Sequence, residues 1–373
     1  MSKRKVTFFI GSLLGGGAEG VCVSIANGLA AKGWSVTLLV LHENNAVYQD
    51  RVNPAVRYEV LGCKSARHAM LPLRRWLTDH QPDKVVVFNH GLAALLVAVR
   101  MTSTVSFHII ARNINTLSQK IRLSKGVLRR HVINPVMYGL FRRVDFVINQ
   151  CNGMKTDLLE IFPELAAKTC VIYNPINAAA TERAAAIGDP STSPDSLEDY
   201  ILCVGRLNEQ KAFHYAIRAF AVIAPDYPCL RLKLLGQGPL ENELKHLADE
   251  LGIRDRVDFH GFESDIWDYY VNARLTLLTS AYEGFPNVLL ESIALGTPIV
   301  AFDCPHGPAE IVQPQENGCL VAYQHGNELV LALRQVLDSA QFTPQRVQQT
   351  SMKFHLSTII DIWDGLLKSP RFS

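Results

Sequence analysis

The sequence predicts an α/β protein with two doubly wound parallel sheets. Short apolar runs alternate with segments whose apolar residues recur at helical spacing, an alternation typical of parallel sheets covered by helices. A stretch rich in Ala, Ser, Pro and Asp interrupts the alternation at residues 178–199 and has the composition of a linker. The length of 373 residues is sufficient for two or three domains. We therefore expect domains over 1–177 and 200–351, a linker over 178–199 and a final helical segment over 352–373.

The first series of apolar runs predicts the sheet of the N-terminal domain. Its expected strands are 6–12, 35–41, 84–89, 107–111, 145–149 and 170–174. Helical spacing of apolar residues predicts helices over 19–32 and 92–100 between these strands. The first run follows basic residues, but it is too short to cross a membrane and leads into a Gly-rich loop. We therefore interpret it as a strand.

The second series predicts another sheet of the same kind. Its expected strands are 200–206, 230–236, 257–261, 275–280, 298–303 and 319–322. Helices are expected over 213–224, 240–251 and 288–295, and a last one over 354–367. In open α/β folds ligands bind outside the carboxyl ends of the strands, so two such halves predict a cleft between these edges.

Charge and cysteine usage restrict the possible functions. The net charge is only +2, but residues 1–175 hold 22 Lys and Arg against 10 Asp and Glu, whereas the remaining residues hold 15 against 25. This asymmetry indicates two domains that face different partners. The eight cysteines form no C-x-x-C pair and most lie in apolar runs, which favours buried thiols in a reducing cytosol over disulfides or a zinc site.

Two glutamates, Glu283 and Glu291, are separated by seven residues and form the most informative motif. The turn between them contains Pro286, which fits the first turn of a helix because its missing N–H would have no partner there. Glu291 then projects from about the second turn. The pair therefore flanks a helix N-terminus, which favours an anion such as a diphosphate, while carboxylates accept hydrogen bonds from sugar and ribose hydroxyls. Both features suit a nucleotide sugar.

The motif E-x7-E, the intervening GFPN and the following ESIALGTPIVAFD, GPAEIV and NGCLV resemble retaining glycosyltransferases of family 4. The resemblance covers most of the second half, with weaker support in the first, and implies the GT-B fold: two Rossmann-like domains that face across a cleft, with a final helix that crosses back to the N-terminal domain. It implies that Glu283 contacts the transferred sugar and Glu291 the ribose. It also implies that the turn between them contacts the donor through Gly284, Phe285, Pro286 and Asn287.

Arg206 and Lys211 follow directly after an expected strand. Two cations at a strand's carboxyl edge can bind a diphosphate and offset the charge on a departing nucleotide. The resemblance assigns them this role and adds donor contacts from the neighbouring loops, at Gly205, Gly236, Gly238 and Phe262. The alternative interpretation of the cations is a pair of solvated charges at a strand end, and that of the glycines is an ordinary tight turn.

The loop after the first strand contains a literal G-x-G-x-x-G, at Gly15, Gly17 and Gly20, and Glu43 follows the second strand. This is the fingerprint of a dinucleotide-binding oxidoreductase, which is therefore an alternative function. The resemblance instead implies that Gly16 and Gly17 approach the donor phosphates. Asn89, His90 and Gly91 end another strand, and His90 is a candidate contact to the transferred sugar, although a lone histidine is more often structural.

The segment 112–143 is basic and contains no acidic residue until Asp145. Apolar residues intersperse the cations, so the segment could lie on an anionic leaflet or bind a lipid-linked diphosphate, but it could also be a solvated helix face. Few aromatic residues accompany the cations, which disfavours nucleic acid as a partner. The candidate acceptor or membrane residues are Arg112, Lys120, Arg122, Lys125, Arg129 and Arg130.

These observations lead to the hypothesis of a cytosolic enzyme at the inner face of the cell membrane. It would transfer a hexosyl or N-acetylhexosaminyl unit, with retention, from a nucleoside diphosphate sugar (UDP is the commonest in the family) to a glycan or lipid-linked acceptor of a bacterial surface polysaccharide. We expect no metal and no cofactor, because the sequence contains no metal-binding cluster and the cations would stabilise the leaving group. The alternatives are an NAD(P)-dependent oxidoreductase and a GT-B epimerase or nucleotide-sugar binding protein.

Overall fold

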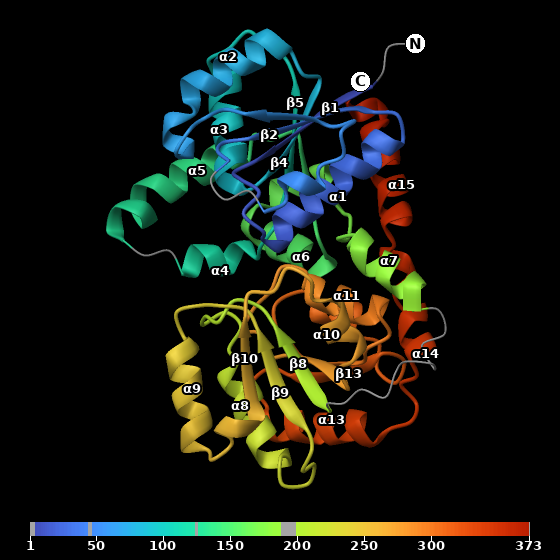
Figure 1. Ribbon diagram of the computed structural model, residues 1–373. Coiled ribbons are helices and arrows are strands. Elements are labelled where there is room, and N and C mark those ends of the chain that lie inside the picture. The colour runs from blue at the N-terminus through green and yellow to red at the C-terminus, as the bar shows by residue number, and fades with distance from the viewer. Residues whose placement is uncertain (1–3, 44–46, 124–125, 188–198, 373) are drawn as a thin grey trace. The chain divides into compact units, whose positions relative to one another are not determined.

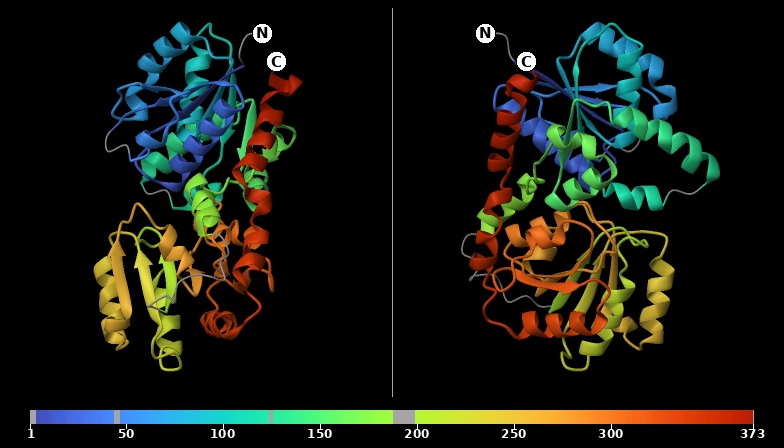
Figure 2. Two further views of the ribbon diagram at one scale, coloured as in Figure 1. Left: turned by 45° about the vertical axis from the view of Figure 1, so that its right-hand side comes forward. Right: turned by 180° about the vertical axis from the view of Figure 1, so that it is seen from behind.

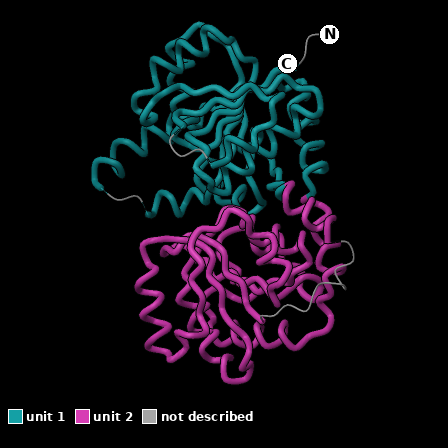
Figure 3. Tube along the Cα trace, viewed as in Figure 1, with its two compact units in different colours: residues 1–177, 355–373 teal, residues 178–354 magenta. Residues whose placement is uncertain are grey.

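The chain divides into two compact units in the computed structural model, which describes residues 4–43, 47–123, 126–187 and 199–372. One unit comprises Met1–Asn177 together with His355–Ser373, and the other comprises Ala178–Phe354 (Figure 3). Each unit contains one parallel sheet with helices on both faces (Figure 1). This is the α/β architecture that the alternation of apolar runs predicts.

The sheet of the first unit has seven parallel strands in the order β3-β2-β1-β4-β5-β6-β7. The strands are β1 (Lys5–Ile10), β2 (Ser35–Val40), β3 (Arg57–Val60), β4 (Lys84–Phe88), β5 (His108–Arg112), β6 (Phe146–Asn149) and β7 (Thr169–Val171). Successive side chains of a strand point to opposite faces, so Phe8 and Phe9 join different hydrophobic clusters. Because both faces are buried, the central strands β1 and β4 consist mainly of Val, Ile and Phe.

Helices cover both faces of this first sheet. The helices α1 (Gly17–Ala31) and α15 (Leu356–Leu367) contribute to the core on one face. The other face is packed by residues of α2 (Met70–His80), α3 (His90–Met101), α5 (Asn134–Phe141) and α6 (Asn152–Ile161). A short helix, α4 (Leu117–Arg122), follows β5. The order of strands reverses between β1 and β4, and this switch point is where open α/β sheets usually bind ligands.

The final helix belongs to the first unit, although the chain reaches it from the second. Helix α15 packs along α1, as the views in Figures 1 and 2 also show. A Cβ atom on Gly28 of α1 would lie 2.5 Å from Cγ1 of Ile360, so the absence of a side chain permits the close approach. Trp363 is fully buried, and Trp34 Nε1 donates to Asp364 Oδ1 at 2.8 Å. The expected return of the last helix is thereby confirmed.

The sheet of the second unit has six parallel strands in the order β10-β9-β8-β11-β12-β13. The strands are β8 (Tyr200–Val204), β9 (Arg231–Leu235), β10 (Val257–Gly261), β11 (Leu275–Leu278), β12 (Ile299–Asp303) and β13 (Gly318–Ala322). The helices are α7 (Ala178–Ile187), α8 (His214–Ile223), α9 (Glu241–Glu250), α10 (Trp267–Val271), α11 (Asn287–Ala294), α12 (Pro308–Ile311), α13 (Gly326–Asp338) and α14 (Pro344–Gln349). All six strands expected in this half are present.

Strand β3 and the expected linker differ from the sequence-based expectations, and α2, α5, α6 and α13 lie outside the expected helical ranges. Strand β3 was not expected, because its residues lie at the sheet edge, are partly or fully exposed and form no apolar run. Part of the expected linker forms helix α7. Its sequence is rich in alanine, the residue with the highest intrinsic helix propensity. Ala184 and Ile187 of α7 pack against a hydrophobic cluster, and Arg183 forms an ion pair with Asp268 at 2.7 Å. The rest of that segment, 188–198, lies outside the described residues.

Candidate functional site

Loops at the carboxyl ends of the strands meet at one edge of the sheet in the second unit. The loop after β8 is bonded to the loop after β11, because Ala281 N donates to Gln210 O at 2.7 Å. It is also bonded to the loop after β9, because Leu207 N donates to Gln237 O at 3.0 Å. This edge is where the sequence predicts a donor site.

Three predicted glycines permit these loops to touch. A Cβ atom on Gly236 would lie 2.0 Å from the carbonyl oxygen of Gly205, and one on Gly238 would lie 2.2 Å from that of Leu207. Both distances are too short for any side chain, and Gly236 also has a φ of 137°, which other residues rarely adopt. The structure therefore brings Gly205, Gly236 and Gly238 together, and their observed role is close backbone packing.

Lys211 and Glu283 form an ion pair at this edge. Lys211 Nζ lies 2.7 Å from Glu283 Oε1, and the two side chains are only 16% and 10% exposed. Ser280 Oγ, which is fully buried, donates to the same carboxylate oxygen at 2.7 Å. A Cβ atom on Gly205 would lie 2.7 Å from Lys211 Cε, so the lysine stem passes directly over this glycine. Ser280 was not predicted as a site residue, since nothing local in the sequence distinguishes it from other serines.

The turn that follows Glu283 is held by the loop after β12. Glu283 N donates to Pro305 O at 2.7 Å, and His306 N donates to Glu283 O at 3.1 Å. Phe285 is buried, with its ring centroid 5.7 Å from that of Phe354, so its side chain is part of the core. Gly284 and Pro286 are also buried, whereas Asn287 is partly exposed. The turn can therefore offer a ligand backbone groups more readily than side chains.

Helix α11 begins at Asn287, with Pro286 in the N-cap position. Its first N–H groups and the positive end of its dipole lie beside the Glu283 turn, an arrangement that suits an anion. Glu291 lies one turn further along and accepts a hydrogen bond from Tyr270 Oη at 3.0 Å. Tyr270 precedes Glu291 by 21 residues and lies on another helix, so only the folded chain reveals the contact.

Two more predicted residues are exposed in loops at this edge. Arg206 follows Gly205 and is exposed, and its guanidinium forms no hydrogen bond or ion pair with the described residues. Phe262 follows β10 and is 56% exposed. Among the described residues no three His, Cys, Asp or Glu side chains are grouped so as to hold a metal ion, and all eight cysteines are free thiols.

The first unit carries the glycine loop and His90. Gly16 is the N-cap of α1, Gly17 is its first residue, and Gly15 has a φ of 103°. His90 is the first residue of α3 and is 1% exposed, with its ring 4.8 Å from that of Phe141. Burial, assisted by the positive charge of Lys120, lowers the pKa of His90 to about 3, so its imidazole is neutral. Its role as a contact to the sugar stays a prediction.

Arg112 was wrongly assigned to an acceptor or membrane surface. It is only 1% exposed, because as the last residue of β5 it turns into the core of the first unit. Its Nη2 donates to Asn174 Oδ1 at 2.8 Å, and its guanidinium lies 5.3 Å from the ring centroid of Trp363. Burial lowers the pKa of Arg112 to about 9. The basic composition of the segment does not show that this strand residue is buried while the helix residues that follow are exposed.

Most of the described remainder of the basic segment is exposed. Lys120 is partly buried, and Lys125 lies outside the described residues. Large apolar side chains are exposed beside the arginines; Val127 is 78% and Leu128 is 66% exposed. The exposed set, which we call the basic apolar surface, consists of Arg122, Leu123, Val127, Leu128, Arg129, Arg130, Val132, Ile133 and Val136. None of the described helices combines the length and the apolar character that crossing a bilayer requires.

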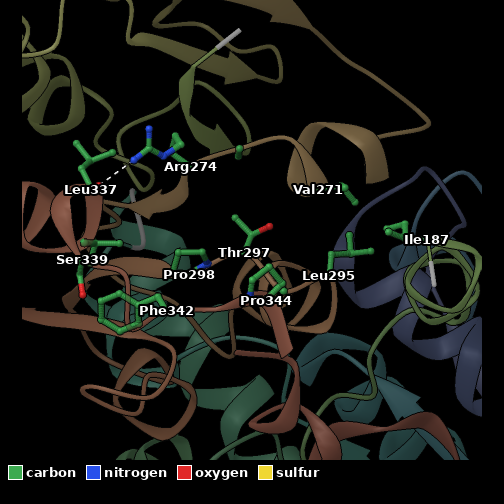
Figure 4. Close-up of a pocket in the computed structure, with 13 residues that line it drawn as sticks. Ile187, Val271, Arg274, Leu295, Thr297, Pro298, Leu337, Ser339, Phe342 and Pro344 are labelled. Carbon is green, nitrogen blue, oxygen red and sulfur yellow. Dashed lines mark hydrogen bonds between the residues drawn. The ribbon is translucent and has the colours of Figure 1, made fainter. Parts of the chain in front are cut away.

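A cavity of about 220 Å³ lies at the opposite edge of the same sheet (Figure 4). Arg274 and Pro298, which line it, immediately precede β11 and β12, so the cavity is at the amino edge of the strands. Most of the residues that line it have apolar side chains, and Arg274 Nη2 donates to Leu337 O at 2.8 Å. The predicted donor-binding residues do not line this cavity.

Comparisons with known proteins match both halves of the chain. Residues 15–180 match the family described as Glycosyltransferase Family 4, and residues 189–352 match Glycosyl transferases group 1. An uncharacterized glycosyltransferase of Haemophilus influenzae is 27% identical over 372 residues, which cover 98% of this chain and 100% of that protein.

Two further relatives have more specific names. An N-acetylgalactosamine-N,N'-diacetylbacillosaminyl-diphospho-undecaprenol 4-alpha-N-acetylgalactosaminyltransferase of Campylobacter jejuni is 31% identical over 200 residues, which cover 53% of this chain and 52% of that protein. The crystal structure of Anabaena HepE in complex with UDP-glucose superimposes with a TM-score of 0.77 at 20% identity and covers 97% of this chain and 99% of that one. At this identity the likeness shows a shared fold.

Proposed function

The chain is a glycosyltransferase of the GT-B fold, with a family 4 domain followed by a group 1 domain, and we propose that it is a retaining enzyme. Its donor would be a UDP-linked hexose or N-acetylhexosamine. Its acceptor would be a glycan or a lipid-linked glycan in the assembly of a bacterial surface polysaccharide. The observation that carries the proposal is the largely buried pair of Lys211 and Glu283 beside the N-terminus of α11.

Each donor group has a matching partner at this edge. Lys211 has three N–H donors, so it can bond to a phosphate oxygen while it remains bonded to Glu283. Arg206 and the N–H groups of α11 would bind the same diphosphate. The carboxylate of Glu283 would accept hydrogen bonds from hydroxyls of the transferred sugar, and that of Glu291 would accept them from the ribose. The backbone of the turn at Gly284 to Asn287 would approach the sugar and phosphate.

The proposed reaction needs no covalent bond to the protein. The bond between the anomeric carbon and the phosphate oxygen breaks, and the acceptor oxygen bonds to the same face of that carbon. The proton of the acceptor hydroxyl moves to the departing phosphate oxygen. Lys211, Arg206 and the α11 N-terminus would stabilise the negative charge that develops on the diphosphate, which is the electrostatic contribution that preorganised cations and N–H groups make.

The acceptor assignment is supported by the basic apolar surface. The Campylobacter relative is named for a substrate linked to undecaprenol through a diphosphate. Exposed arginines attract anionic lipid, at about 1 kcal/mol for each cation near the surface, and exposed Val127 and Leu128 can enter the interface. We therefore propose peripheral contact with the inner face of the cell membrane.

Flotation with anionic liposomes tests the membrane contact. Reversal of both charges in Arg129→Glu, Arg130→Glu should reduce the bound fraction. The matched control is Arg74→Glu, Arg75→Glu, because these arginines are also adjacent and exposed, but lie on α2. Equal binding by the two variants would remove the basic apolar surface from the membrane assignment.

The alternative functions of this chain would give different experimental outcomes. Both domains match glycosyltransferase families, which leaves the oxidoreductase suggested by Gly15, Gly17 and Gly20 without support. A sugar-nucleotide epimerase of the same fold would convert the donor in the absence of an acceptor. A binding protein would retain the nucleotide sugar and form no glycan product.

A transfer assay distinguishes these outcomes. The protein is incubated with labelled UDP-sugars, one at a time, with and without a lipid extract of bacterial membranes. We expect label in the glycolipid fraction, release of UDP and an anomeric configuration, read by NMR, that matches the donor. Donor conversion without acceptor would identify an epimerase, and an inverted product would contradict the retaining mechanism.

A further inference from the structure

Tyr270 contacts Glu291, the second of the two glutamates of the E-x7-E motif. It lies on α10, is completely buried and donates from Oη to Glu291 Oε2 at 3.0 Å. Burial first, and then the negative charge of Glu291, raise the pKa of this phenol well above its ordinary value. Tyr270 therefore keeps its proton near neutral pH, and it acts towards Glu291 as a donor.

A chain of buried hydrogen bonds fixes the position of Tyr270 itself. Thr297 Oγ1 donates to the carbonyl oxygen of Tyr270 at 2.5 Å. Ser292 Oγ, on α11, lies 2.8 Å from both Thr297 O and Thr276 Oγ1. Thr276, Ser292 and Thr297 are all buried, so breaking any of these bonds would leave a polar group unsatisfied in the core. The chain ties α10, α11 and β11 together around Glu291.

The two motif acids are thus held by different donors. Glu283 is bonded to Lys211 and Ser280, whereas Glu291 is bonded to Tyr270. Ordering a free glutamate side chain costs up to about 2 kcal/mol, and a carboxylate that is already oriented avoids this cost when a ligand binds. One carboxylate can accept several hydrogen bonds, so the bond from Tyr270 is compatible with others from vicinal hydroxyls.

We propose that Tyr270 is a positioning residue that holds the Glu291 carboxylate in the orientation that accepts the ribose hydroxyls of the donor. This inference rests on the proposed function, which assigns Glu291 to the ribose. Tyr270 touches neither the sugar nor the diphosphate in this scheme. Its loss should therefore weaken recognition of the ribose hydroxyls without weakening recognition of the diphosphate.

The test compares two nucleotides and two phenylalanine variants by calorimetric titration. UDP and 2′,3′-dideoxy-UDP differ only in the ribose hydroxyls. Tyr270→Phe removes one oxygen atom and retains the buried ring. The matched control is Tyr200→Phe, because Tyr200 lies in the same hydrophobic cluster and its Oη donates to Tyr269 O at 2.8 Å rather than to Glu291. Thermal unfolding of each variant establishes that it is folded.

We expect Tyr270→Phe to bind UDP about tenfold more weakly than the wild type and to bind dideoxy-UDP with unchanged affinity, because one hydrogen bond to a charged group is lost. Tyr200→Phe should leave the affinity for each nucleotide unchanged. Equal losses for UDP and dideoxy-UDP, or no loss for either, would overturn the inference while the proposed function stands. If the wild type itself binds both nucleotides equally, the ribose role of Glu291 fails, and the positioning role fails with it.

Discussion

Replacement of Lys211 by methionine tests the largely buried ion pair with Glu283. Two unit charges 2.7 Å apart attract each other by about 6 kcal/mol at an effective dielectric constant of about 20. Desolvation offsets much of this attraction, and removal of one partner from a buried pair costs ~3–5 kcal/mol. Because the two side chains are slightly exposed and Ser280 still donates to Glu283, we expect a loss of about 2 to 3 kcal/mol in the free energy of unfolding.

The effect of Lys211→Met on catalysis should exceed its effect on stability. Loss of a preorganised group that stabilises developing charge lowers kcat by roughly 10²–10³-fold. Methionine retains most of the length of the stem that passes over Gly205, so the packing at that glycine is largely preserved. The rate is measured as UDP release in the presence of acceptor, and the stability is measured by urea unfolding.

The control is Lys245→Met, at a second Lys–Glu pair in the same unit. Lys245 Nζ lies 2.6 Å from Glu241 Oε1, but both side chains are 35% exposed and the pair spans one turn of α9. Such surface pairs contribute about 0.3–0.5 kcal/mol, so stability should change little and the rate should not change. A wild-type rate in folded Lys211→Met would refute the assignment of Lys211 to the diphosphate.

Two further predictions concern the first unit. Gly28→Ala should lower the melting temperature, although alanine is the better helix former. The new Cβ would lie 2.5 Å from Ile360 Cγ1, and such overpacking costs about 1–3 kcal/mol. An increase in the melting temperature would contradict the packing of α15 on α1. His90 has a folded pKa of about 3, below its unfolded value of about 6.5, so the unfolded chain takes up the proton first and stability falls as the pH falls between these values. Urea unfolding at several pH values should show that the free energy of unfolding of the wild type falls by about 1.4 kcal/mol per pH unit, and that this contribution is absent from His90→Gln. The same pH dependence of stability in both proteins would contradict a buried neutral His90.

The sheets could be predicted because their buried strands are predominantly apolar runs. Strand β4 (Lys84–Phe88), for example, is followed directly by a helix with apolar residues at helical spacing. Strand β3 carries no such pattern, because an exposed edge strand buries little of its surface. Helix α7 was missed because alanine has a high helix propensity but gives no apolar periodicity.

The grouping of the proposed donor-binding residues in the second unit could be predicted, because most of them are close in sequence. Glu283, the turn and Glu291 form one segment, and parallel topology brings Lys211 to the same edge. The donors that hold the two acids could not be predicted, since Ser280 and Tyr270 meet them only through tertiary packing. The assignment of Arg112 to an acceptor or membrane surface was wrong for a related reason, because the burial of this residue depends on which face of β5 it occupies.

Hydrogen–deuterium exchange with and without UDP tests the central claim most directly, because it shows where the nucleotide binds. We predict slower exchange in the loop after β8, residues 205–212, and in the segment from Ser280 to Glu291. The cavity at the amino edge, around Arg274 and Phe342, should show no change. Protection at that cavity, or only in the glycine loop of the first unit, would contradict a donor site at the carboxyl edge of the second sheet.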